Sequence, residues 1–199
     1  MTIVEIAWFK STKAYQEDHT LLYETARRLK EFSGLNKLYL GWQIEPDPTI
    51  AYVLNVWESY DHYIAAGKEK EYSETFATFQ PALDGTYADI SVAMIPFTSG
   101  PEEAVGAPVT EIVLANLKDG KEDENMTALF DAIGSTGKLS GHHWGRVRDK
   151  ENQVALLVGW KSVEFHYEVA KTDIFLDVIK LGEETLLRPS VAHVAFKEM

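Results

Sequence analysis

The sequence contains no cysteine among its 199 residues. Disulfide scaffolds, thiolate metal sites and cysteine nucleophiles are therefore excluded. Basic residues are also scarce, since 19 lysines and arginines stand against 31 aspartates and glutamates, which gives a formal net charge of -12. The deficit is shared by both halves of the chain, whereas binding to phosphate groups needs concentrated positive charge. Neither nucleic acid nor an anionic membrane surface is therefore expected as a partner.

Long apolar runs and the common cofactor motifs are missing as well. No stretch approaches the roughly 20 apolar residues that span a bilayer, and residues 1–10 lack the pattern of a signal peptide. We therefore expect a cytoplasmic protein. The sequence has no phosphate loop, dinucleotide fingerprint, nucleophile elbow or zinc-binding helix motif. Accordingly, neither a cofactor nor a metal ion is expected.

What the sequence does contain is an internal repeat. Residues 53–59 read VLNVWES and residues 156–162 read LLVGWKS, and a His-Tyr pair follows each stretch. Further matching segments lie upstream, at 4–7 and 110–113, and downstream, at 92–97 and 191–196. Matches in the same order at nearly the same offsets indicate a duplicated unit of roughly 90–100 residues, which is a usual domain size.

The hydrophobic pattern predicts the same order of elements in both copies. In the first copy we expect strands at 2–9, 37–44, 50–57 and 90–97, and helices at 17–32 and 60–79, the second broken near Gly67. In the second copy we expect strands at 109–117, 143–148, 153–160 and 190–196, and helices at 123–133 and 162–181, the second broken near Lys171. Each copy is thus predicted to be a ferredoxin-like βαββαβ unit of the α+β class.

The predicted domains are residues 1–97 and 109–199. Residues 98–108 contain glycine, proline and glutamate without periodicity, and they are predicted to be the linker. The strands are apolar on both faces, although a half-solvated antiparallel sheet should alternate between apolar and polar residues. We therefore expect the two sheets to pack face to face as a pseudo-dimeric α+β barrel within one chain. Whether two such chains form a further homodimer stays open.

The end of the third predicted strand carries a resemblance to a known family. Residues 56–59, VWES, followed by a broken helix, resemble the antibiotic biosynthesis monooxygenase (ABM) type domain of the dimeric α+β barrel superfamily, and residues 159–162 match it more loosely. The resemblance covers nearly all of the chain outside residues 98–108. This superfamily includes cofactor-free oxygenases of aromatic polyketides, polyketide cyclases, haem-degrading enzymes, muconolactone isomerase and stress proteins. The haem-degrading branch matches least, because its axial histidine would fall at Gly67 and Ala170.

The resemblance implies a pocket between each sheet and its helices, and a small hydrophobic molecule, aromatic or polyketide-like, as the partner. Our leading hypothesis is a cofactor-independent enzyme of the monooxygenase or polyketide cyclase type. In it, a histidine removes a proton, and aromatic side chains together with Asn55 hold the resulting anion. The alternative is a non-catalytic ligand-binding or stress-responsive barrel whose pockets are filled by side chains.

Two groups of residues are candidates for the site. The predicted catalytic residues are His62 and His166, which follow the repeated tryptophans, and His193, which aligns with Met94. The predicted substrate contacts are Asn55, Trp57, Tyr63, Trp160, Tyr167 and Asn116. Each also has a structural interpretation: the aromatic residues as core packing, the histidines as core or helix residues, and Asn55 as a buried amide that needs partners.

Two further pairs stand out for their positions. His142 and His143 are adjacent on a predicted strand, so only one of them can face inward, and a joint metal site is not expected. Glu5 and Glu111 occupy matching positions in the two copies. They are expected either to pair with basic neighbours or to end a sheet edge.

Overall fold

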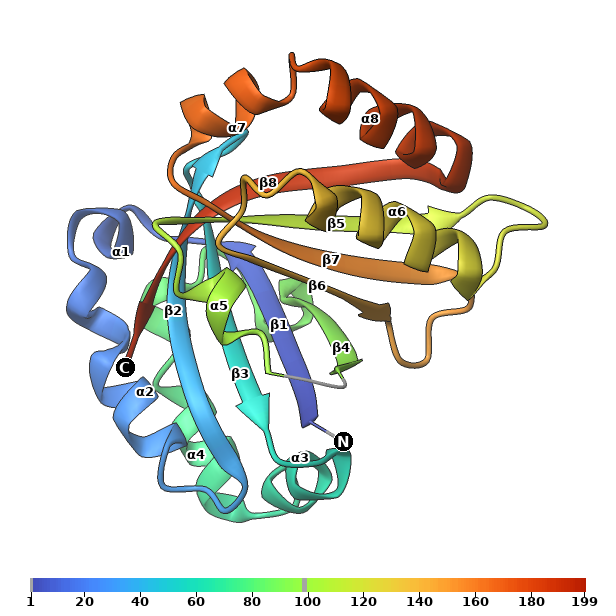
Figure 1. The fold of residues 1–199 in the computed structure, drawn as a ribbon. Coiled ribbons are helices and arrows are strands. Elements are labelled where there is room, and N and C mark those ends of the chain that lie inside the picture. The colour runs from blue at the N-terminus through green and yellow to red at the C-terminus, as the bar shows by residue number, and fades with distance from the viewer. Residues whose placement is uncertain (1, 98–99) are drawn as a thin grey trace. The chain divides into compact units, whose positions relative to one another are not determined.

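The structure, a computed structural model, describes residues 2–97 and 100–199, and the chain divides into two compact units. The first unit contains Met1–Ser99 and Lys197–Met199, and the second contains Gly100–Phe196. When neighbouring helical pieces are counted together, each unit contains the order β-α-β-β-α-β, and one short additional helix precedes it in the second unit (Figure 1). The predicted α+β class and ferredoxin-like order of the two copies are therefore confirmed.

The first unit has an antiparallel sheet in the order β4-β1-β3-β2. Its strands are β1 (Thr2–Lys10), β2 (Leu35–Glu45), β3 (Ile50–Trp57) and β4 (Ser91–Phe97). The helical pieces are α1 (Lys13–Glu17), η1 (His19–Leu22), α2 (Tyr23–Leu29), α3 (Tyr60–Ala66), α4 (Lys70–Ala77), η2 (Gln80–Ala82) and η3 (Tyr87–Asp89). In Figure 1, α2 and α4 lie side by side on one face of this sheet.

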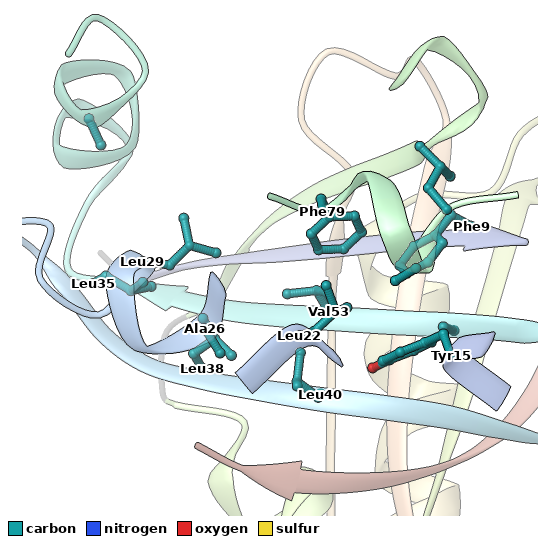
Figure 2. Close-up of a cluster of buried hydrophobic side chains, with 14 of the residues drawn as sticks. Phe9, Tyr15, Leu22, Ala26, Leu29, Leu35, Leu38, Leu40, Val53 and Phe79 are labelled. Atoms are coloured by element: carbon teal, nitrogen blue, oxygen red, sulfur yellow. The ribbon is translucent and has the colours of Figure 1, made fainter. Parts of the chain in front are cut away.

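The core of the first unit lies between that face and the helices. Every second residue of a strand points to the same face, so Phe9 on β1 and Val53 on β3 meet Leu22 and Leu29 from the helices (Figure 2). Burying each such side chain contributes about 1.5–3 kcal/mol. Val4, on the opposite face of β1, is also fully buried, in agreement with strands that are apolar on both faces. The packing of one sheet on the other stays a prediction.

The helix predicted at residues 17–32 is shorter and interrupted. The chain is extended at Asp18 (φ -137°, ψ 94°), and the Asp18 carboxylate accepts a hydrogen bond from the Thr20 backbone N–H. Aspartate competes with helical hydrogen bonds in this way and favours a cap, so α1, η1 and α2 replace one helix. The break near Gly67 is confirmed, since α3 ends at Ala66 and α4 begins at Lys70.

The second unit repeats the arrangement with the sheet order β8-β5-β7-β6. Its strands are β5 (Val109–Leu117), β6 (Gly141–Arg146), β7 (Gln153–Trp160) and β8 (Leu186–Glu198), and the end of β8 belongs to the first unit. The helices are α5 (Glu102–Val105), α6 (Asp123–Ser135), α7 (Val163–Val169) and α8 (Asp173–Thr185). In Figure 1, α6 and α8 lie side by side over this sheet. The predicted break near Lys171 is confirmed.

The segment predicted as a linker contains structure of its own. Residues 98–99 lie outside the described residues, but α5 follows them and packs on the second sheet, with Ala104 fully buried. The close approach depends on two glycines paired across β6 and β7, Gly141 and Gly159. A Cβ at Gly141 would lie 2.8 Å from the backbone nitrogen of Ala104, and a Cβ at Gly159 would lie 3.0 Å from the carbonyl oxygen of Ala104. Any larger residue would therefore push α5 away from the sheet. The sequence pattern missed this helix because it is only one turn long.

Within the part of the chain that the structure describes, none of the helices has both the length and the apolar character that a bilayer crossing requires.

Candidate functional site

A buried carboxyl group lies at the centre of the first unit. Glu5, in the middle of β1, pairs with Asn55 on β3 and with Met94 on β4. Only 7% of Glu5 is exposed. Its Oε2 accepts hydrogen bonds from Asn55 Nδ2 and from Trp57 Nε1, both at 3.0 Å. Of the two expectations for Glu5, pairing with a basic neighbour and ending a sheet edge, neither is met among the described residues. Its hydrogen-bond donors are the neutral N–H groups of Asn55 and Trp57, and β1 is paired on both sides.

The environment of Glu5 favours its protonated form. Burial raises the pKa of the Glu5 carboxyl, because a low-dielectric interior disfavours the charged form. The hydrogen bonds from Asn55 and Trp57 oppose this shift of the pKa, since they favour the carboxylate. A carboxyl group whose pKa is moved toward neutrality can act as a general acid or base.

Glu5 opens onto a cavity of about 470 Å³ between the sheet and the helices of the first unit. This volume falls within the range of about 300–1,000 Å³ that is usual for small-molecule sites. The sheet contributes Glu5 and Val92, and the remaining lining residues come from α3, α4 and η3: Tyr63, Tyr72, Ser73, Phe76, Ala77 and Tyr87. The cavity is therefore a largely aromatic chamber with one carboxyl group in its wall.

Two of the lining tyrosines can donate hydrogen bonds into this chamber. Burial raises the pKa of Tyr63 and of Tyr72, and the nearby charge of Glu5 raises both further. Both hydroxyl groups therefore keep their protons at neutral pH. The ring of Tyr63 meets that of Trp57 edge-on, with centroids 5.8 Å apart, so the same tryptophan contacts both the acid and one of the donors.

Asn55 retains one unsatisfied group. Its Nδ2 donates to Glu5, but its Oδ1 is buried and has no hydrogen-bond partner among the described residues. An unsatisfied buried acceptor costs about 1–3 kcal/mol, so such atoms are rare in folded proteins. The side chain thus holds Glu5 through its amide group, while its carbonyl oxygen stays buried and does not line the cavity.

The second unit builds a different site on the same frame. Glu111 on β5 pairs with Val158 on β7 and His193 on β8, and Trp160 Nε1 donates to Glu111 Oε2 over 2.8 Å. Burial raises the pKa of Glu111 to about 7, and the hydrogen bond from Trp160 opposes this shift. Val158 stands where the first unit has Asn55, so Glu111 lacks the amide donor that Glu5 has in addition to its tryptophan.

His166 lies between Glu111 and His193. Its Nε2 is 3.8 Å from Glu111 Oε2, and its Nδ1 is 2.7 Å from His193 Nε2. The His166 ring also stacks on Trp160, with centroids 4.4 Å apart. Both histidines are buried, with 9% of His166 and 2% of His193 exposed. The structure therefore brings these two predicted catalytic residues together with a carboxylate.

His62 does not occupy the position of His166. The N-cap Ser59 accepts from the backbone N–H of His62, whereas the N-cap Ser162 accepts from that of Phe165. When the two helices are aligned on their N-cap serines, His62 therefore matches Phe165, and Tyr63 matches His166. The two His-Tyr pairs are thus out of step by one residue. His62 Nδ1 lies 2.9 Å from Ser59 Oγ, and the residue does not line the cavity.

The other predicted contacts are dispersed. Trp57 and Trp160 are fully buried and hold the two carboxyl groups. Tyr167 is 47% exposed and stacks beside His166. Asn116 is exposed and lies on the face of β5 opposite to Glu111, because their positions differ by an odd number of residues.

The sequence patterns did not identify Glu5 and Glu111 as functional groups. The signal was present, because an acidic residue inside an apolar strand is rarely buried without a partner, and this feature occurs at the same place in both copies.

Comparisons with known proteins identify the fold. No protein-family model and no curated protein matches the chain. Among solved structures, a proposed monooxygenase from Fusobacterium nucleatum matches 99% of this chain and 93% of its own length, with a TM-score of 0.72 and 13% identity. A proposed monooxygenase from Lactobacillus acidophilus matches 99% of this chain and 95% of its own length, with a TM-score of 0.69 and 11% identity. An anthrone oxidase-like protein matches 98% of this chain and 91% of its own length, with a TM-score of 0.73 and 11% identity.

Proposed function

We propose that this chain, which has the dimeric α+β barrel fold of the proteins compared above, is a cofactor-independent enzyme for a small, hydrophobic, aromatic substrate. The substrate binds in the cavity of the first unit, and Glu5 removes a proton from it. One observation carries the proposal: a buried carboxyl of raised pKa faces an aromatic chamber large enough for a small molecule. A fold alone does not specify an activity, so the site provides the argument.

The side chains around Glu5 have distinct roles in this reaction. The Glu5 carboxylate accepts the proton, while Asn55 and Trp57 fix its position through Oε2. The hydroxyl groups of Tyr63 and Tyr72 donate to the oxygen on which the negative charge of the substrate develops. The rings that line the cavity offer an apolar surface on which an aromatic substrate can pack.

The anion formed in this way can react directly with molecular oxygen. In a substrate whose CH2 group is conjugated to a ketone through an aromatic ring, the carbanion left by proton removal supplies the electrons and forms a C–O bond to O2. Glu5 returns its proton to the peroxide, and the hydroperoxide then loses water by breaking the O–O bond and the remaining C–H bond. One oxygen atom stays as a new carbonyl and the other leaves in water, so the substrate is the only reductant. An intramolecular aldol closure of a polyketide-like chain would begin with the same proton removal.

An anthrone is the appropriate first substrate, because it has such a CH2 group and because one structural neighbour is named anthrone oxidase-like. Oxygen uptake and anthraquinone formation from dithranol, an anthrone, should be measured for the wild type and for Glu5→Gln. We expect the variant to lose about 10²–10⁴-fold in rate, the usual contribution of a general base. Glu71→Gln, which alters an exposed acid in the first turn of α4, is the matched control.

Three outcomes are informative. Equal rates for Glu5→Gln and Glu71→Gln would reject Glu5 as the base. Binding of dithranol without oxygen uptake by the wild type would favour the ligand-binding alternative for this substrate class. Loss of binding in a variant that narrows the cavity, such as Ala77→Phe, would support the cavity as the place of binding.

A further inference from the structure

We infer that Glu111, His166 and His193 form a binding site for one divalent transition-metal ion in the second unit. One ligand atom from each residue can be chosen so that all three atoms lie within 4.8 Å of one another. This site lies in the other unit and uses other residues than the proton removal proposed at Glu5. An experiment can therefore reject one of the two proposals and leave the other standing.

The three residues converge from different elements. Glu111 on β5 and His193 on β8 are direct partners across the sheet, and α7 places His166 beside them. Two imidazoles and one carboxylate suit Zn²⁺, Fe²⁺, Co²⁺ or Ni²⁺, whereas Mg²⁺ and Ca²⁺ prefer oxygen ligands. Three protein ligands would leave a coordination position for water or a small molecule, as in catalytic zinc sites.

The geometry is close to that of a bound ion. Metal–nitrogen bonds of about 2.0–2.1 Å place two ligands of a tetrahedral site roughly 3.3 Å apart. His166 Nδ1 and His193 Nε2 are 2.7 Å apart, so small rotations of the two rings admit an ion between them. Trp160 donates to Glu111 Oε2, and such a bond from a neighbouring side chain orients a carboxylate ligand.

The first unit provides an internal control for this interpretation. It has the same carboxylate and tryptophan, Glu5 and Trp57, but it has Tyr63 and Met94 where the second unit has His166 and His193. The βαββαβ frame therefore forms without imidazoles at these positions. Among the described residues, Glu111, His166 and His193 thus place three potential metal ligands together in the second unit, at positions where the first unit has one.

The test is metal binding by the full chain after dialysis against a chelator. Isothermal titration with ZnCl2 should give one ion per chain, and Co²⁺ should produce visible absorption bands of a low-coordinate site. Glu111→Gln and His193→Met, the latter introducing the residue of the first unit, should each weaken Zn²⁺ binding by at least about 10-fold. His142→Gln is the matched control, because His142 lies in the same unit and stacks on Phe130 instead.

The proposal is overturned if the metal-stripped wild type does not bind Zn²⁺ or Co²⁺ above the level of the His193→Met variant. It is also overturned if both Glu111→Gln and His193→Met bind Zn²⁺ as tightly as His142→Gln and the wild type do. The two histidines would then form only a hydrogen-bonded pair. A measurement on the wild type alone avoids dependence on variant folding: Co²⁺ should produce paramagnetically shifted NMR signals from two imidazole rings, and signals from one ring or none contradict the site.

Discussion

Trp57 donates a hydrogen bond from its indole Nε1 to Glu5 Oε2 over 3.0 Å. The second unit repeats this pair, with 2.8 Å between Trp160 Nε1 and Glu111 Oε2. The bond connects the end of the third strand of each unit to the middle of the first strand. Around this shared pair the two copies have diverged, because Asn55 completes the environment of one carboxyl and His166 that of the other.

The hydrogen bond from Trp57 should matter most when Glu5 is charged. We expect Trp57→Phe to lower the free energy of unfolding by about 1–3 kcal/mol near pH 8, because a buried carboxylate loses a donor. The loss should be smaller near pH 5, where more of Glu5 is protonated. Urea unfolding at both pH values measures the difference. Trp144→Phe is the control, since Trp144 donates to no carboxylate among the described residues. If the loss of unfolding free energy depends on pH equally in both variants, the proposed role of the Trp57–Glu5 hydrogen bond is contradicted.

The raised pKa of Glu5 gives a pH dependence of stability with a defined sign. The folded protein holds this proton more tightly than the unfolded chain, whose glutamates titrate near about 4.3. The stabilising contribution is therefore complete below that value and is lost as the pH rises through the folded-state pKa.

Glu5→Gln removes this titration. We expect the melting temperature of Glu5→Gln, relative to that of the wild type, to rise as the pH increases from about 4 to about 8. The reason is that the wild type must bury a charged carboxylate at the higher pH. Scanning calorimetry across this range provides the measurement, with Glu71→Gln as the exposed control. Parallel curves for the wild type and Glu5→Gln would show that the pKa of Glu5 is not raised.

The cavity tyrosines should contribute to rate and not to substrate affinity. Once an oxidisable substrate is in hand, we expect Tyr63→Phe and Tyr72→Phe each to lower kcat by about 10²-fold with little change in KM, because each removes a donor to the developing anion. Tyr23→Phe, outside the cavity, should retain the wild-type kcat. A change confined to KM would assign these hydroxyl groups to substrate binding.

The glycine pair beneath α5 should tolerate no side chain. A Cβ at Gly141 would approach Glu103 Cβ to 2.6 Å, so we expect Gly141→Ala to destabilise the protein by about 1–3 kcal/mol. Gly182→Ala is the control in the same unit, because no atom lies within 4 Å of the added Cβ, and removing a glycine from α8 should stabilise by about 0.5–1 kcal/mol. Chemical denaturation of the two variants tests whether the expected signs are opposite.

The second unit should fold with the residues of the first. We expect the double variant His166→Tyr/His193→Met, without metal, to retain the circular dichroism spectrum and a melting temperature close to that of the metal-stripped wild type. The reason is that Tyr63 and Met94 occupy these positions in the first unit. A variant that does not fold would show that the histidine pair supports the structure itself.

Much of the architecture follows from the sequence because it depends on local order and on repetition. The strands at Ile50–Trp57, Val109–Leu117 and Gln153–Trp160 were predicted to the residue, since continuous apolar runs bounded by turn residues define a buried strand. The repeated tryptophan and the matching glutamates gave the alignment of the two copies. Composition alone excluded every function that requires a thiol.

Contacts between residues distant in the sequence were decided by the tertiary structure. Glu5 and Trp57 are 52 positions apart, and no local pattern indicates that one strand register brings a carboxyl to an indole. The same applies to His166 and His193, whose meeting depends on how α7 lies over β8. A shift of one residue along a helix rotates a side chain by about 100°, as 3.6 residues complete a turn. The sequence therefore determined which residues the two copies share, whereas the packing determined that Tyr63, and not His62, faces the acid.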